Sequence, residues 1–344
     1  MSNQPRAVIF GLAGPSLAAA ERRLFTAARP VGFILFARNC LEPAQIRDLV
    51  DDLRDCAGGS EVLVLIDQEG GRVQRLKPPR WRAAPAAERI GSLGERDEAA
   101  AVEAAWLHGR LLAADLQPLG IDVDCAPVLD VRRPEGHGII GDRAFAAQPG
   151  RVAQLGRATC AGLLAGGVLP VIKHIPGHGR AALDSHEALP VVNAGTDELR
   201  ALDFQPFAAL ADMPLAMTAH VVYAAFDRTA PATTSATVIR EVVRGAIGFD
   251  GLLMSDDLCM RALTGTPGER ARAALAAGCD VLLHCNGDLT EMEAIAEACP
   301  PLLAGGARRL ARAQAMRSAL SRSIRSAPAS GWLLCWAERW PPDG

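Results

Sequence analysis

The chain has 344 residues, of which 49% are hydrophobic, and a formal net charge of −3. A chain of this length can bury roughly 75% of the surface that its unfolded form exposes, so one large domain or two medium ones are both possible. No block of Lys and Arg indicates a nucleic-acid partner, no apolar run reaches the roughly 18 residues of a membrane-spanning helix, and the N-terminus lacks a secretory-signal pattern.

Eight short apolar runs, each followed by a polar or glycine-rich patch, are predicted as strands. They cover residues 7–10, 31–36, 62–66, 121–124, 169–172, 215–218, 251–254 and 280–283. Ala-rich amphipathic stretches between most of them are predicted as helices, at residues 43–57, 97–117, 150–166, 196–212, 235–246, 268–278 and 290–299. Alternating strands and helices indicate βα units on a parallel sheet.

This pattern predicts an α/β fold, a single-domain (β/α)8 TIM barrel over residues 1–322, because eight strands that are apolar on both faces fit a closed barrel. A doubly wound open sheet is the alternative, but no GxGxxG follows the first strand. Residues 323–344 follow the last basic helix and break the periodicity, so we expect a partly ordered C-terminal tail.

The nine cysteines are odd in number and lack CxxC spacing, which favours a reducing, cytoplasmic setting over a disulfide framework. Aromatic residues make up only 4% of the chain. Clefts that bind long polysaccharides usually present rows of aromatic side chains, so the scarcity of aromatic residues in this chain favours a small polar substrate. Nothing in the sequence requires a cofactor or a partner chain, and we expect a monomer.

Polar side chains follow most of the predicted strands at their C-terminal ends, where barrel enzymes carry their chemistry. In chain order they are Asp67 and Glu69, Asp124 and Asp130, Lys173 and His174, His220, Asp256 and Asp257, and His284. Charged or polar side chains from five or more strands are therefore expected at the same end of the barrel, and core packing does not explain this arrangement.

The stretch KHIPGHGRAALDSHEALP (173–190) is the densest of these groups and is broken by Pro and Gly, which is typical of an active-site loop. Asp184 and His186 are two residues apart, so the carboxylate can orient the imidazole for proton transfer near neutral pH. An ordinary surface turn is the alternative, since Asp and Ser are common turn residues.

Asp256 is the candidate nucleophile because it stands at the mouth of the seventh strand. Side chains alternate along a strand, so one of Asp256 and Asp257 can face the pocket while the other braces a loop. Both could instead be helix caps. Lys173, Arg75 and Arg143 are candidate polar anchors, although a single Arg is more often a solvated surface charge.

Six sequence motifs, which occur in the same order as in the family, resemble those of the family 3 glycoside hydrolases, specifically the bacterial single-domain β-N-acetylglucosaminidases (β-hexosaminidases) of peptidoglycan recycling. They are DQEGGRVQRL (67–76), APVLDV (126–131), GDRAF (141–145), KHIPGHG…DSHEALP (173–190), MTAHVVY (217–223) and MSDDL (254–258). The resemblance implies a retaining exo-enzyme that releases terminal N-acetylglucosamine from small muropeptides, with an N-acetylglucosaminyl-anhydro-muropeptide as its partner molecule and no metal or cofactor.

The resemblance also implies roles for individual residues. Asp256 matches the nucleophile, His186 the general acid/base, and Asp184 the carboxylate that supports this histidine. The residues that match sugar-binding positions are Asp67, Arg75, Arg143, Lys173 and His174, whereas His220 and His284 receive no role. The chain departs from the family pattern at Arg180 and Ala181, where Asp-Thr is usual, at Cys259, where Ser is common, and at Ala224 and Val238.

Four alternatives to this chemistry remain open at the level of sequence. The acetamido group of the substrate could attack C1 with help from Asp256 and Asp257. His174, His178, Asp184 and His186 are residue types that could bind a metal ion in a metal-dependent hydrolase. Lys173 could form a Schiff base in a lyase, and a barrel that only binds sugar is conceivable because a fold alone does not prove activity.

Overall fold

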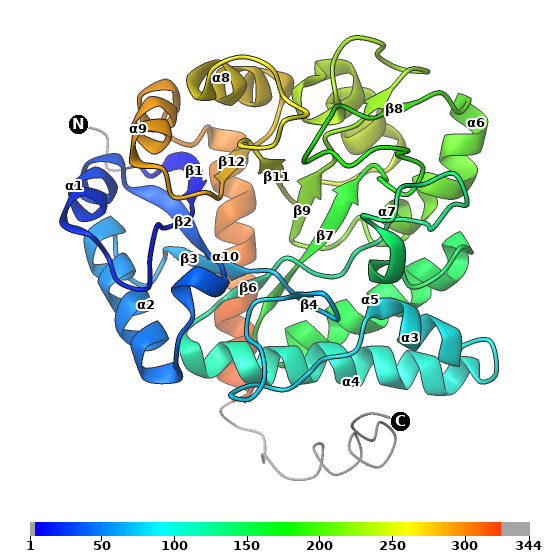
Figure 1. Ribbon diagram of the computed structural model, residues 1–344, viewed down its shortest axis with the longest axis horizontal. Helices are drawn as coiled ribbons and strands as arrows, with labels where there is room; N and C mark the ends of the chain where they lie inside the picture. Colours follow the sequence, from blue (N-terminus) through cyan, green and yellow to red (C-terminus); the bar gives the residue numbers. More distant parts are fainter. Residues whose placement is uncertain (1–3, 325–344) are drawn as a thin grey trace.

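Eight parallel strands close a barrel in the computed structural model, which describes residues 4–324 (Figure 1). The strands are β1 (Arg6–Phe10), β2 (Pro30–Leu35), β3 (Leu63–Ile66), β6 (Val123–Asp124), β7 (Leu169–Ile175), β9 (Leu215–Thr218), β11 (Leu252–Asp257) and β12 (Val281–His284). Their order around the barrel is β1-β12-β11-β9-β7-β6-β3-β2, and Val8 of β1 lies opposite Leu282 of β12 where the ring closes. The predicted TIM barrel is therefore confirmed, and the open sheet is excluded.

Helices surround the barrel in Figure 1. They are α1 (Ala19–Ala28), α2 (Pro43–Ala57), α3 (Ala87–Leu93), α4 (Glu98–Leu116), α5 (Pro149–Ala165), α6 (Thr196–Glu198), α7 (Gln205–Ala209), α8 (Pro267–Ala277), α9 (Leu289–Ala298) and α10 (Ala304–Ile324), with π-helical turns at Leu199–Asp203 and Val238–Ala246. Within residues 4–324, no helix combines the length and the apolar character needed to cross a membrane.

Each predicted helical stretch contains helix, but the one at 196–212 is divided into α6, a π-helical segment and α7. Pro206 in the first turn of α7 accounts for the break, because proline cannot donate the hydrogen bond that a continuous helix would need there. Helix α1 was not predicted from the sequence, because Phe25 is its only large apolar side chain that is buried. The predicted tail begins within α10, which ends at Ile324, and its residues 325–344 lie outside the described part of the chain.

A short antiparallel hairpin after β3 shapes one side of the barrel mouth. It pairs β4 (Gln68–Gly70) with β5 (Val73–Gln74) and turns at Gly70 and Gly71, whose φ angles are 100° and 55°. Residues other than glycine rarely adopt this backbone conformation, and a Cβ on Gly70 would lie 2.3 Å from the carbonyl oxygen of Pro85. The turn therefore needs glycine, and it returns the chain so that Arg75 faces Asp67.

The loop after β7 is anchored at a second short pair of strands, β8 (Val191–Val192) and β10 (Val222–Tyr223). The hydroxyl of Tyr223, the only tyrosine in the chain, is fully buried and donates a hydrogen bond of 2.5 Å to the carbonyl oxygen of Gly177. Gly179 packs so closely on the segment after β6 that a Cβ would lie 1.9 Å from the carbonyl oxygen of Val131. These contacts fix the start of the loop that carries Asp184 and His186.

Candidate active site

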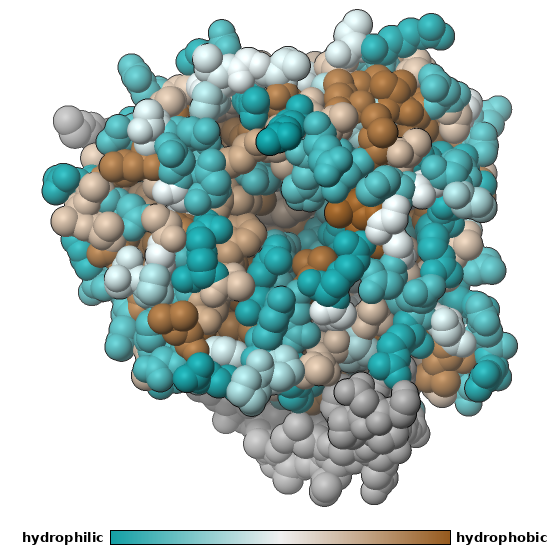
Figure 2. Space-filling model, viewed as in Figure 1, coloured by the Kyte–Doolittle hydropathy of each residue, from teal (hydrophilic) through white to brown (hydrophobic). Residues whose placement is uncertain are grey.

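A cavity of about 260 Å³ opens among the loops that follow β3, β6, β7 and β11. In Figure 2, hydrophilic side chains surround a hollow near the centre of the face in view. Seven of the eight predicted site residues line this cavity, namely Asp67, Arg75, Arg143, Lys173, His174, His186 and Asp256. The eighth, Asp184, contacts His186, so the structure brings all eight together.

The floor of the cavity is a network of ion pairs centred on Lys173, whose side chain is only 2% exposed. Its Nζ lies 2.8 Å from Oδ1 of Asp67 and 2.7 Å from Oε1 of Glu69. Arg143 binds Glu69 through two hydrogen bonds of 2.8 Å, and Arg75 contacts Asp67 at 3.0 Å. Forked guanidinium contacts of this kind are both strong and directional.

The charges of this network are mutually stabilised. Burial disfavours the ammonium of Lys173, but Asp67 and Glu69 outweigh burial and raise its pKa. Burial likewise disfavours the carboxylate of Glu69, yet Arg143 and Lys173 lower its pKa to about 2. All members are therefore charged near neutral pH, and Lys173 is held as an ammonium ion rather than as a free amine.

His174 is held by Asp130, a carboxylate buried beneath it. Nδ1 of His174 lies 2.7 Å from Oδ2 of Asp130, which leaves Nε2 for the cavity, 3.5 Å from Nη2 of Arg143. The other oxygen of Asp130 accepts hydrogen bonds from the backbone N–H groups of His174 and His178, at 3.2 and 2.6 Å. Asp130 thus ties the end of β7 to the loop that follows it.

His178 is a structural residue of this loop. Its side chain is buried, and its Nε2 lies 3.1 Å from Oγ of Ser185, next to Asp184 and His186. Burial and the neighbouring His174 lower the pKa of His178 to about 4, so the ring is neutral near pH 7. His178 and His174 therefore contact other partners, and the four residues named above as possible metal ligands do not converge on one point.

His186 and Asp184 form the predicted pair at the mouth of the cavity. Nδ1 of His186 lies 2.8 Å from Oδ1 of Asp184, and the same oxygen accepts the backbone N–H of His186 at 2.9 Å. The side chain of His186 is 62% exposed, whereas that of Asp184 is 17% exposed. The carboxylate therefore holds Nδ1 and leaves Nε2 of the ring available to exchange protons.

Asp256 and Asp257 are the last two residues of β11 and have different partners. Oδ1 of Asp256 accepts the backbone N–H of Asp257 at 2.8 Å, and burial, which opposes its charge, is outweighed by His220 and His174, which lower its pKa. Oδ1 of Asp257 accepts the backbone N–H groups of Cys259 and Cys285 at 3.0 and 3.1 Å. Asp257 thus braces the neighbouring loops and Asp256 is ionised, but both residues line the cavity, whereas the sequence predicted that only one of them would face it.

The structure also adds residues that the sequence analysis left without a role. Glu69 was noted at the rim but not as an anchor, although alternation along the chain from Asp67 places both on one side. Asp130 was likewise only noted. His220 is a buried histidine with both ring nitrogens partnered, Nδ1 to Oγ1 of Thr233 at 2.7 Å and Nε2 to the carbonyl oxygen of Asp257 at 3.0 Å.

The chain matches the model of the glycosyl hydrolase family 3 N-terminal domain over residues 10–308. A β-hexosaminidase of Alkalilimnicola ehrlichii is 42% identical over 283 residues, which cover 81% of this chain and 80% of that protein. A β-hexosaminidase of Bordetella avium is 39% identical over 286 residues, which cover 82% and 81% of the two chains.

Solved structures of related glycoside hydrolases also match this chain. Native NagZ from Neisseria gonorrhoeae superposes with a TM-score of 0.86 at 33% identity, covering 97% of this chain and 96% of that one. A family 3 β-N-acetylglucosaminidase from Paenibacillus gives a TM-score of 0.81 at 32% identity, and the match covers 94% of this chain but only 63% of that longer one. The chain therefore belongs to glycoside hydrolase family 3, as a single-domain glycoside hydrolase of the β-N-acetylhexosaminidase type.

Proposed function

We propose that the enzyme is a retaining exo-β-N-acetylglucosaminidase that removes a terminal non-reducing N-acetylglucosamine from small muropeptides in cytoplasmic cell-wall recycling. One observation carries the mechanism: Asp256, at the end of β11, and His186, in the loop after β7, line the same cavity. An ionised carboxylate and an imidazole on one cavity are the two groups that a double displacement at a sugar carbon requires.

The size and the floor of the cavity support exo-cleavage of one sugar. A volume of about 260 Å³ lies just below the range of roughly 300–1,000 Å³ that is usual for drug-sized ligands, so it suits a single pyranose unit. Asp67, Glu69, Arg143 and Lys173 offer charged hydrogen-bond partners for hydroxyl and acetamido groups. His186 is the most exposed of the proposed catalytic groups, where the leaving part of the substrate would lie.

In the first step, Asp256 attacks C1 of the sugar, and His186 gives the proton on Nε2 to the departing oxygen. The bond between C1 and that oxygen breaks, and a glycosyl ester of Asp256 forms. In the second step, Nε2 of His186 takes a proton from water, which attacks C1 and releases Asp256. Two displacements at C1 retain the β configuration. Asp184 stabilises the imidazolium and fixes the ring orientation throughout.

The setting and the substrate class have separate support. The eight cysteines among residues 4–324 are all free thiols, which fits a reducing compartment. The relatives named above are β-hexosaminidases and an N-acetylglucosaminidase, which supports the N-acetyl sugar. The muropeptide aglycone and the monomeric state rest on the resemblance of the sequence motifs and on the absence of any sequence feature that requires a partner.

Contacts in the site bear on two of the alternative reactions. Schiff-base chemistry needs a neutral amine, but Nζ of Lys173 lies between two carboxylates that raise its pKa. Oδ1 of Asp257 accepts two backbone N–H groups, but Asp257 also lines the cavity, so binding of a thiazoline inhibitor is the test of substrate-assisted cleavage.

The test is a panel of p-nitrophenyl β-glycosides with the wild-type enzyme, D256A, H186A and the exposed control D48A. We expect the N-acetylglucosaminide to be the only good substrate, loss of activity in D256A, and a fall of about 10²–10⁴ in kcat for H186A. D48A should match the wild type. A 2-fluoro sugar should label Asp256, whereas label on another residue, or tight binding of a thiazoline with no covalent adduct, would show that the mechanism is wrong.

A further inference from the structure

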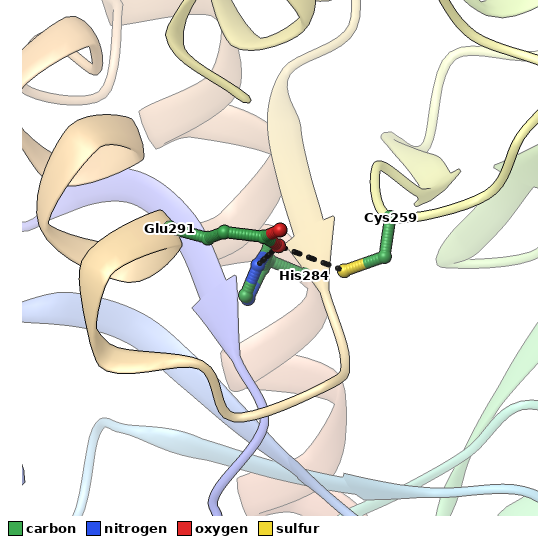
Figure 3. A group of neighbouring side chains, drawn as sticks. All are labelled: Cys259, His284 and Glu291. Atoms are coloured by element: carbon green, nitrogen blue, oxygen red, sulfur yellow. Dashed lines mark hydrogen bonds and ion pairs between the residues drawn. The ribbon is translucent and has the colours of Figure 1, made fainter. Parts of the chain in front are cut away.

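Three side chains that could bind a metal ion converge beside the barrel mouth, outside the sugar cavity (Figure 3). Cys259 follows β11, His284 ends β12, and Glu291 lies in the first turn of α9. The thiol, the imidazole and one carboxylate oxygen all lie within 4.8 Å of one another, and no other group of His, Cys, Asp and Glu in residues 4–324 has this spacing.

None of these three residues lines the sugar cavity, and the proposed reaction uses none of them. The family resemblance gives His284 no role, and Cys259 stands where serine is common. The cluster is therefore not accounted for by the hydrolysis of a glycoside, and at least one of its members is a departure of this chain from its family pattern.

We propose that Cys259, His284 and Glu291 bind one Zn²⁺ ion through Sγ, Nε2 and a carboxylate oxygen, with water as the fourth ligand. Tetrahedral zinc with the usual bond lengths holds such ligand atoms about 3.4–3.6 Å apart. Here Nε2 of His284 lies 3.0 Å, and Sγ of Cys259 lies 3.8 Å, from Oε2 of Glu291. Small rotations of the side chains would bring all three atoms to zinc distance.

The residue types select the ion. A thiolate and an imidazole favour zinc over calcium and magnesium, which prefer oxygen ligands throughout. The thiolate and the carboxylate together would neutralise the two charges of Zn²⁺. A thiol binds zinc as a thiolate, so the ion displaces a proton from sulfur, and binding should tighten as pH rises.

Neighbouring contacts hold the ligands in place. The ring of His284 is 1% exposed and packs edge-on against Phe10, with ring centroids 6.2 Å apart. Nδ2 of Asn286 donates to Oε2 of Glu291 at 2.8 Å, which orients the carboxylate. The side chain of Glu291 is 38% exposed, so an ion can reach the cluster from solvent.

A bound ion would also connect the two segments behind the proposed nucleophile. Oδ1 of Asp257 accepts backbone N–H groups from Cys259 and from Cys285, the residue after His284. Zinc bound to Cys259 and His284 would therefore cross-link both segments that hold Asp257, and Asp257 adjoins Asp256. The site is thus a structural clamp on the C-terminal ends of β11 and β12.

The test uses the full chain, freed of metal by a chelator and titrated with Co²⁺, a spectroscopic substitute for Zn²⁺. We expect one equivalent to bind with a sulfur-to-cobalt charge-transfer band and with release of a proton. C259S, which installs the residue common in the family, should lose the charge-transfer band. C259S and E291Q should each bind Zn²⁺ at least about 100-fold more weakly than the wild type. Loss of a ligand weakens metal binding at least as much as loss of a residue that only orients a ligand.

C56S is the matched control, because Cys56 is also partly exposed but belongs to no such cluster, and it should behave as the wild type. Zinc should raise the Tm of the wild type and of C56S but not that of C259S. An unchanged charge-transfer band in C259S would overturn the proposal. So would loss of the bound ion in H186A with retention in C259S, because the ion would then sit on the Asp184–His186 pair.

Discussion

Nζ of Lys173 lies 2.8 Å from Oδ1 of Asp67, although the lysine side chain is only 2% exposed. The two residues come from β7 and from the end of β3, which are not neighbours in the barrel because β6 lies between them. Their contact therefore spans the end of β6, and it joins two segments of the sugar site. Breaking it should affect folding and binding together.

Replacing Lys173 by methionine should lower the free energy of unfolding by about 3–5 kcal/mol, because removing one partner leaves buried carboxylates without compensation. The KM for the N-acetylglucosaminide should also rise. Urea unfolding and steady-state kinetics measure the two effects. Lys77 is exposed, so K77M is the control and should change neither. If K173M were as stable as the wild type, Lys173 would not be compensating the buried carboxylates on the cavity floor.

Replacing Asp184 by asparagine should lower kcat by about 10²–10⁴ for substrates whose leaving group needs a proton, because the ring of His186 would lose its charged partner. A dinitrophenyl leaving group departs without a proton, so D184N should slow glycosyl transfer from that substrate far less. Kinetics with both leaving groups check this. D197N, at an exposed site, is the control. Equal losses with both substrates would argue that Asp184 only shapes the loop.

The free energy of unfolding should fall as the pH drops below about 4.5. Glu69 has its pKa lowered in the folded state from 4.5 to about 2, after the effect of burial is outweighed by Arg143 and Lys173. A carboxylate whose pKa is lower in the folded state than in the unfolded state stabilises the fold at pH values above its unfolded-state pKa. This stabilisation is lost as the pH falls through the folded-state pKa, and here it amounts to on the order of 3 kcal/mol. Urea unfolding at several pH values measures this slope.

In E69Q the slope between pH 4.5 and about 2 should be shallower than in the wild type, because this ionisation is absent. E95Q, which removes an exposed carboxylate, should keep the wild-type slope. If E69Q and the wild type lose stability in parallel over that range, other carboxylates control acid unfolding.

Replacing Arg180 by alanine should loosen the loop that carries His186. Arg180 lies 2.8 Å from both Asp203 and Glu198 and 3.0 Å from Glu135. Asp203 is only 2% exposed, so its unpaired carboxylate should cost about 1–3 kcal/mol. Backbone amides of residues 181–189 should exchange hydrogen faster and kcat should fall, whereas R240A, at an exposed pair, should leave both unchanged. Unaltered exchange in R180A would mean that other contacts hold the loop.

The strands and the rim of the barrel were predictable because they depend on local pattern. Apolar runs buried on both faces give eight strands, and parallel strands collect their polar ends on one side. The end of β7 was not predictable: the apolar run predicts a strand that ends at residue 172, but β7 continues to Ile175. Lys173 can lie in a buried strand only because Asp67 and Glu69 compensate its charge, and these residues are more than 100 positions away.

The roles of Glu69 and Arg180 were hidden for the same reason. The partner of Glu69, Arg143, is 74 residues along the chain, and no local period connects them. Arg180 departs from the family pattern, and nothing near it in the sequence indicates a role for the arginine. Its three acidic partners lie on other segments, and the structure shows that the substituted residue is itself an anchor of the loop.

The ion pairs on the cavity floor also bear on inhibitor design. Arg143 holds Glu69 by two N–H groups and Lys173 shares that carboxylate, so the floor keeps its shape before any sugar arrives. Groups that are already ordered lose little conformational entropy when a ligand binds, and the flexibility of the ligand then dominates that loss. Ring-locked sugar mimics should therefore bind this enzyme more tightly than flexible analogues that carry the same polar groups.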